Sequence, residues 1–170
     1  MTPAESDYLS QLASLSLSFV GFSAVVVTLR GALGGSLSKR HLRLVRMYIE
    51  GGLLITSLAL VPRLLNLLQI PDGVAWQLAS ATAASIFTAL LLIQFRRRRA
   101  IEPGPFPLWV LIIYVVATVA VAGLWFNAVA FPFAPNVGPY AIFLTLALCI
   151  FGFIFVRTME LFLHHEGGDE

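Results

Sequence analysis

The sequence predicts an all-α, polytopic integral membrane protein built as a bundle of five transmembrane helices. Of the 170 residues, 58% are hydrophobic and only 12% are charged, whereas soluble domains carry about 25% charged residues. A soluble fold of this size could not bury so much apolar surface, so we expect the lipid bilayer to be its solvent. No stretch is long and polar enough for a separate soluble domain. We therefore expect residues 1–170 to form one transmembrane domain with short polar loops and a short cytoplasmic tail.

The first predicted span covers residues 8–29 and contains no charged residue. About 20 apolar residues, rising 1.5 Å each, cross a hydrocarbon core of roughly 30 Å. Polar and small residues recur along it every three or four positions and therefore share one helix face; they are Gln11, Ser14, Ser18, Gly21, Val25 and Thr28. Such a face suits close helix packing in lipid. It also suits the wall of a water-filled path, and the sequence leaves both interpretations open.

The second predicted span, residues 44–70, carries an acid and a base well inside its apolar limits. At about 100° per residue, one helix face collects Gly52, Thr56, Ala59, Arg63 and Asn66. A second face collects Arg46, Glu50 and Ser57. Proline lacks an N–H, so Pro62 leaves the carbonyl of Leu58 without its helical partner. These features make the second span the candidate for any function inside the membrane.

Arg63 has two interpretations. An unpaired charge this deep in a span costs about 2.5 kcal/mol or more. In the first interpretation, Arg63 belongs to a structural polar cluster with Asp7 and Gln11 of the first span and Asn127 of the fourth. In the second, it lines an outward vestibule, and a ring of arginines in an oligomer would favour anions.

Glu50 also has two interpretations, because it lies four residues after Arg46. The spacing suits an ion pair at the end of the span. An acid inside a span is also a candidate cation or proton site. The adjacent Gly51 and Gly52 predict that another backbone or a ligand approaches closely here.

The remaining spans differ in side-chain size. The third, residues 73–95, has small residues from 79 to 85, so we expect it to form the packing core of the bundle. Residues 103–156 contain no Asp, Glu, Lys, Arg or His, and the breakers around residues 131–139 divide this stretch into spans 106–130 and 139–163. Their bulk and low polarity predict that they face lipid more than the first three spans do.

The basic residues alternate between the two sides of the predicted bundle. They gather in the loop after the first span and at the end of the third, as Lys39, Arg40, Arg43, Arg96, Arg97, Arg98 and Arg99. Positive residues favour the cytoplasmic side and contact anionic lipid headgroups. We therefore expect an outside N-terminus, a cytoplasmic C-terminus and a bacterial inner membrane location. The arginines fit this topology better than they fit nucleic-acid binding, which we do not expect.

Catalytic signals are weak. The histidines, His41, His164 and His165, all lie near the predicted cytoplasmic face, and the single cysteine Cys149 has no metal-type spacing to them. We expect no cofactor and no metal. The pattern favours a small, non-enzymatic homo-oligomeric channel or transport protein with a path lined by the first two spans. The alternatives are a membrane-embedded adaptor or signalling subunit and an intramembrane lipid-modifying enzyme.

Overall fold

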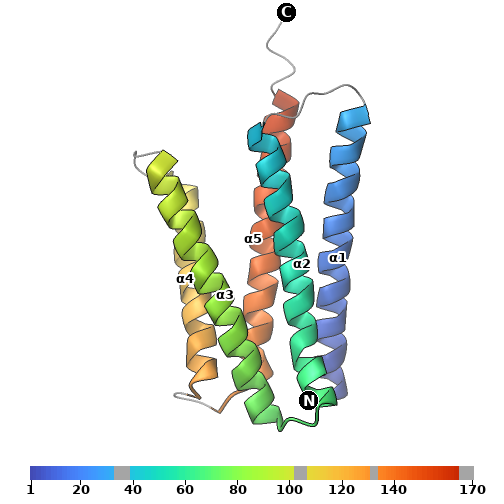
Figure 1. The fold of residues 1–170 in the computed structure, drawn as a ribbon, viewed down its shortest axis with the longest axis vertical. Helices are drawn as coiled ribbons and strands as arrows, with labels where there is room; N and C mark the ends of the chain where they lie inside the picture. Colours follow the sequence, from blue (N-terminus) through green and yellow to red (C-terminus); the bar gives the residue numbers. More distant parts are fainter. Residues whose placement is uncertain (33–38, 102–106, 131–133, 165–170) are drawn as a thin grey trace, which may run out of the picture.

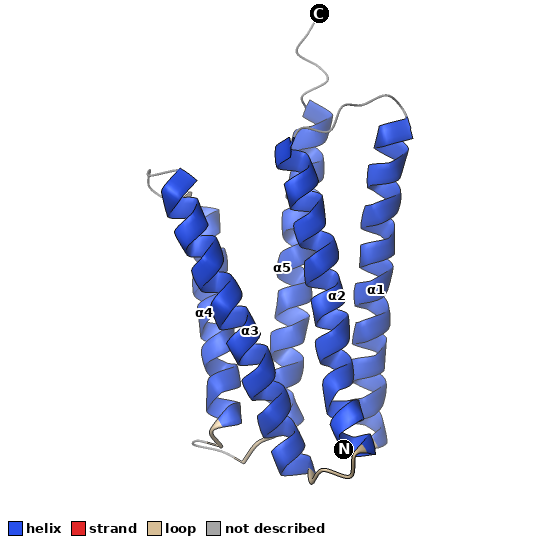
Figure 2. Cartoon of the chain, viewed as in Figure 1, coloured by secondary structure: helices blue, strands red, loops and turns tan. Residues whose placement is uncertain are grey.

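The structure, a computed structural model, describes residues 1–32, 39–101, 107–130 and 134–164, without the side chains of residues 27, 30–32, 39–45, 98–101 and 157–164. The described residues form helices and no strand (Figures 1 and 2). The helices are α1 (Pro3–Ala32), α2 (Lys39–Leu67), α3 (Asp72–Ile101), α4 (Leu108–Ala128) and α5 (Val137–His164). All five are long and apolar enough to cross a membrane, and they overlap the five predicted spans. The predicted fold class is therefore confirmed.

The helices run alternately up and down, so each end of the bundle has its own set of connections. The N-terminus and the turn between α2 and α3 lie at one end, which we name the amino end (Figure 1). The last turns of α3 and α5 lie at the opposite end, which we name the carboxy end. Helices α1 and α2 pack along each other, as do α3 and α4.

Helix α1 begins five residues before the predicted span because its first turn is capped. The backbone N–H of Thr2 donates to the carboxylate of Glu5 at 2.7 Å, and the N–H of Glu5 donates to the Thr2 hydroxyl at 3.3 Å. This reciprocal pairing is a capping box, and it satisfies donors that a helix start leaves free. Pro3 occupies the first helical position, where a missing N–H costs nothing.

The turn between α2 and α3 is tight because Gln69 adopts a left-handed backbone with φ 59°. The N–H of Ile70 bonds to the carbonyl of Leu65 at 3.2 Å, and the N–H of Gln69 bonds to that of Asn66 at 2.9 Å. This pair of bonds is the Schellman pattern that ends many helices. It places the start of α3 directly beside the end of α2.

Helix α5 is the central helix of the bundle, because it contacts each of the other four. The prediction that the fourth and fifth spans face lipid more than the first three do is therefore wrong for α5, which is buried to the same extent as α1. Its aromatic residues fill gaps between the other helices: Phe143 packs edge-on against Phe87 of α3 at 4.7 Å, and Phe155 packs against Phe19 of α1 at 5.3 Å. Composition alone predicts that a Phe-rich helix faces lipid. Large rings also suit the middle of a bundle, however, where small residues on neighbouring helices leave space for them.

Helix α4 has the most exposed surface of the five, as predicted for that span. In α3, the small-residue segment is buried on one face only. Ala79, Ala83 and Ala84 are buried, whereas Thr82 and Ser85 are exposed. The third span therefore contributes one packing face and not the whole core.

Candidate functional site

Helices α1 and α2 approach each other closely at Gly52. A Cβ atom at this position would lie 2.3 Å from Cγ2 of Val20, so only glycine fits without a shift. The carbonyl of Gly52 accepts the hydroxyl of Ser16 at 2.8 Å and that of Thr56 at 3.0 Å. Thr56, predicted to lie on a path, is therefore part of a closed seam between α1 and α2.

Gly51 makes the matching contact on the other side of α2. A Cβ atom there would lie 2.5 Å from the ring of Phe151 on α5. A side chain of another helix therefore lies close to each of the two glycines, where the sequence predicted a backbone or a ligand. Beside them, the fully buried Tyr48 donates its hydroxyl to the carbonyl of Ile154 at 3.2 Å.

The carbonyl that Pro62 leaves free has a partner on α5. Tyr140 is fully buried and donates its hydroxyl to the carbonyl oxygen of Leu58 at 2.6 Å. Leu58 lies four residues before Pro62, so its carbonyl lacks the usual helical N–H. Trp76 of α3 packs beside the Tyr140 ring at 6.0 Å. The irregular position in α2 is thus closed by an interhelical hydrogen bond.

Asn127 lies in a different cluster from Arg63. Its side chain is buried and donates to the hydroxyl of Ser80 on α3 at 2.8 Å and to the carbonyl of Asn136 at 3.0 Å. Its own carbonyl oxygen accepts the backbone N–H of Asn136 at 3.1 Å. The side chain of Asn136 in turn caps α5 by accepting the N–H of Gly138 at 2.9 Å. Asn127 therefore joins α3, α4 and the start of α5.

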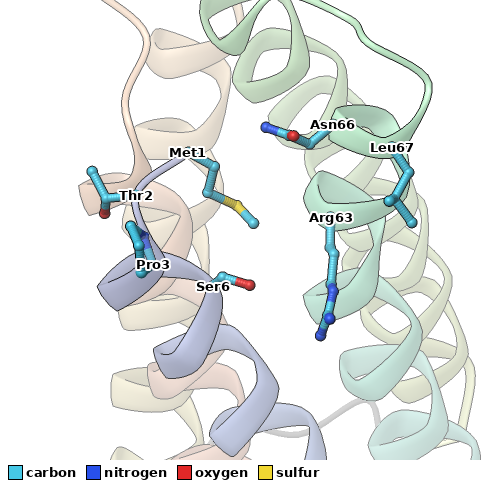
Figure 3. Close-up of a pocket in the computed structure, with 7 residues that line it drawn as sticks. All are labelled: Met1, Thr2, Pro3, Ser6, Arg63, Asn66 and Leu67. Carbon is cyan, nitrogen blue, oxygen red and sulfur yellow. The ribbon is translucent and has the colours of Figure 1, made fainter.

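Arg63 lies at the amino end, on the rim of an open pocket between α1 and α2 (Figure 3). Its guanidinium donates to the hydroxyl of Ser10 at 3.3 Å, and its side chain is exposed. Asn66, one turn later on α2, donates to the carboxylate of Asp72 at 3.1 Å. The same carboxylate pairs with the amino group of Met1. The structure thus brings Arg63 and Asn66 together, as predicted, but places Ser10 beside Arg63 where we expected Gln11, Asp7 or Asn127.

Arg46 and Glu50 form the second charged group of α2. Their side chains meet at 2.6 Å, and they are 79% and 61% exposed. The predicted i,i+4 ion pair is confirmed, and it lies on the outer surface of the bundle. Whether Glu50 also binds a cation or a proton stays a prediction.

The predicted polar face of α1 points away from the rest of the protomer. Gln11, Ser14, Ser18 and Thr28 are all exposed. The three hydroxyls each donate to the carbonyl four residues earlier in α1, at 2.8 to 2.9 Å. On α2, the exposed Ser57 does the same with Leu53 at 2.9 Å. The hydroxyls of Ser14, Ser18, Thr28 and Ser57 are therefore hydrogen-bonded within their own helices and leave a weakly polar outer face.

The basic residues assigned to the membrane surface are only partly described. Arg96 and Arg97 are exposed near the carboxy end of α3. The side chains of the others, namely Lys39, Arg40, Arg43, Arg98 and Arg99, lie outside the described residues. The same is true of His41, His164 and His165. Among the residues that the structure describes, no group of three His, Cys, Asp or Glu side chains is placed to hold a metal ion.

Two of these arrangements were not predicted from the sequence. The Asn127 cluster had one sequence signal, an asparagine within an uncharged span. The partner of the Leu58 carbonyl had only Pro62 as its signal, because nothing in the spacing relates Tyr140 to residue 58.

Comparison of the chain with protein-family models, with curated proteins and with solved structures found no match.

Proposed function

We propose that this chain is one subunit of an oligomeric membrane channel or transport protein whose path runs between subunits along the outer face of α1 and α2. One observation carries the proposal: seven of the charged and polar side chains of these two spans lie on the outside of the protomer. They are Gln11, Ser14, Ser18, Arg46, Glu50, Ser57 and Arg63, and all are exposed.

A bilayer makes this placement costly for a monomer. Arg63 would face hydrocarbon at a cost of about 2.5 kcal/mol or more, and lipid tails offer no hydrogen bonds. A neighbouring subunit with water between the two would remove this cost. The close contact at Gly52 supports a shared path, because at that level it leaves no space between α1 and α2 within one protomer.

The charges of α2 lie on two different faces and at opposite ends of the helix, with Arg63 on the face toward α1. Arg63 and the Arg46–Glu50 pair are separated by up to 17 residues of α2, about 25 Å along the helix axis. An arginine without a carboxylate partner attracts anions, whereas the ion pair at the other end is nearly neutral. We therefore propose anion selectivity set at Arg63.

Cysteine cross-linking tests the shared face. The chain has one cysteine, so Cys149→Ser gives a cysteine-free background. In that background, Ser18→Cys on α1 is expected to cross-link two subunits in native membranes. Thr118→Cys on α4 is the matched control, since Thr118 is also exposed and bonded to its own helix at 2.7 Å. Equal cross-linking of both variants would contradict the proposed face.

Ion flux in liposomes tests the function. Wild-type protein is expected to pass anions faster than empty liposomes do, and Arg63→Ala and Glu50→Gln are expected to lower the flux, while Thr118→Ala leaves it unchanged. Arg63 and Glu50 are exposed, so both variants should fold. The proposal fails if folded wild-type protein passes no ion of either sign over a range of voltage and pH.

A partner-binding subunit is the second candidate, favoured by the hydrogen bonding of the same face. The hydroxyls of Ser14, Ser18 and Ser57 are satisfied within their own helices, which suits close packing against another helix. This candidate predicts that Ser18→Cys is protected from labelling in cells but forms no cross-link between copies of the chain. Copurification of a stoichiometric partner, without flux, would then identify the function as binding.

A further inference from the structure

The pocket at the amino end, between the first turns of α1 and the last turns of α2, has the features of a ligand site. Its volume is about 250 Å³. Since one water takes up about 30 Å³ of liquid, this space holds roughly eight waters or a group the size of phosphate. Its polar lining comes from Thr2, Ser6, Arg63 and Asn66. Its apolar lining comes from Met1, Pro3 and Leu67.

Arg63 supplies a charge that the protein leaves largely unmatched. A guanidinium has five N–H donors, and the single hydrogen bond to Ser10 uses one of them at a long 3.3 Å. Within the described part of the chain, Arg63 makes no ion pair. Two carboxylates at this end of the bundle have other partners: Glu5 binds the N–H of Thr2, and Asp72 binds Asn66 and the amino group of Met1.

The direction of the Arg63 side chain makes this unmatched charge more costly. Arg63 lies four residues before the end of α2, about 6 Å along the axis. Long basic side chains near a helix end usually reach outward to the interface. Figure 3 instead shows the Arg63 side chain running away from Asn66 and Leu67, toward the middle of the bundle, and its hydrogen bond to Ser10 agrees with that direction. A charge held at this depth requires an anion or water beside it.

A hydroxyl donor faces the same space. Ser6 lines the pocket on α1, and its hydroxyl points toward the Arg63 side chain (Figure 3). An arginine accompanied by a hydroxyl donor matches the several oxygens of a phosphate group. The apolar side chains at the rim match the glycerol and acyl atoms that would follow such a group in a lipid.

We propose that the pocket binds a phosphate oxyanion, with the Arg63 guanidinium as its main ligand and the hydroxyl of Ser6 as a further donor. The phosphate comes either from a phospholipid headgroup or from a free anion in solution, and both present the same oxygens. This site goes beyond the proposed transport function, because binding at the pocket requires neither flux nor a second subunit.

The test measures binding to the purified full-length protein in a non-ionic detergent. The probes are inorganic phosphate, dioctanoyl phosphatidylglycerol and dioctanoylglycerol, the last having the same acyl chains without phosphate. Arg63→Gln is expected to weaken phosphate-bearing probes by about 10- to 100-fold, the range of a charge-assisted hydrogen bond. Arg63→Lys, which keeps the charge but loses the planar fork, is expected to lie between Arg63→Gln and wild type. Thr118→Ala, on α4 and outside both the pocket and the proposed path, is the control and should bind as wild type does.

Each outcome separates the sources or overturns the site. Binding of phosphatidylglycerol alone assigns a lipid headgroup, and binding of inorganic phosphate assigns a soluble anion, provided that Arg63→Gln removes either one. Equal affinity of wild type and Arg63→Gln for both phosphate probes overturns the proposal, as does equal binding of dioctanoylglycerol and phosphatidylglycerol without any phosphate binding. Because flux is not measured, a protein that binds phosphate but conducts no ion would refute the proposed function and leave this site standing.

Discussion

The hydrogen bond between Tyr140 and Leu58 leads to a specific prediction about stability. Tyr140→Phe removes the hydroxyl that donates to the Leu58 carbonyl at 2.6 Å, in a place where both groups are buried. Because Pro62 has no N–H, no helical donor then remains for that carbonyl. We expect the variant to fold with an unsatisfied carbonyl inside the bundle.

The magnitude follows from two contributions. Interhelical hydrogen bonds in membrane proteins contribute about 0.6 kcal/mol on average and up to about 1.7 kcal/mol. A buried polar group left without a partner costs about 1–3 kcal/mol. We therefore expect Tyr140→Phe to lower the free energy of unfolding by about 1–2 kcal/mol. In a Pro62→Ala background, the restored N–H takes over the carbonyl, and the same change should cost less than about 0.5 kcal/mol.

The assay is reversible unfolding in mixed micelles with increasing sodium dodecyl sulfate, followed by circular dichroism. A double-mutant cycle cancels the separate packing effect of Pro62→Ala and leaves the coupling, expected at about 1 kcal/mol. Tyr8→Phe is the matched control, because the Tyr8 hydroxyl meets Thr145 at 2.7 Å but the ring is 43% exposed. It should cost little and show no coupling. Equal costs of Tyr140→Phe in the two backgrounds would refute the reasoning.

Three further predictions use the same assay. Gly52→Ala is expected to cost about 1–3 kcal/mol because its Cβ would lie 2.3 Å from the stiff side chain of Val20; Val20→Ala should restore most of the loss, whereas Gly21→Ala, with no atom within 4 Å, should be neutral or stabilising by up to about 1 kcal/mol. Asn127→Leu should cost about 2–4 kcal/mol, because it removes three hydrogen bonds between α3, α4 and the start of α5; a cost below 1 kcal/mol would mean that the cluster does not hold these helices together. Arg46→Gln breaks an exposed ion pair and should change stability by less than about 0.5 kcal/mol.

Helix number and type were predictable because the bilayer imposes length and polarity on each span. The helix ends were less predictable, since caps decide them. Thr2 and Glu5 extend α1 toward the N-terminus through a pattern of only four residues. The position of α5 was not predictable from composition, because lipid and a neighbouring helix are equally apolar surroundings for phenylalanine. What decides between them is the set of small residues on other helices, such as Gly51 beneath Phe151.

Within the candidate site, relations along one helix were predictable and relations between helices were not. Helix periodicity correctly predicts the Arg46–Glu50 pair and the shared outer face of Ser14 and Ser18. The prediction from depth in the membrane, that Asn127 lies near Arg63, is wrong. The rotation of α4 about its own axis turns the Asn127 side chain to Ser80 instead. Residue spacing within a span gives the angles between side chains around the helix axis. It carries no information on which neighbouring helix each of these side chains faces.

The distribution of polar groups separates what holds the protomer together from what is left for another molecule. Ser16, Asn127 and Tyr140 are buried, and each reaches a partner on another helix or connection. The exposed hydroxyls of Ser14 and Ser18 bond only to their own helix, so lipid, a subunit or a partner can cover them at little cost. Arg63 fits neither group, because a guanidinium cannot be satisfied by its own helix carbonyls and is not buried against an acid. Its charge is therefore a polar feature of the described surface that requires an anion or water beside it, and substitutions there should change binding and flux while leaving the fold intact.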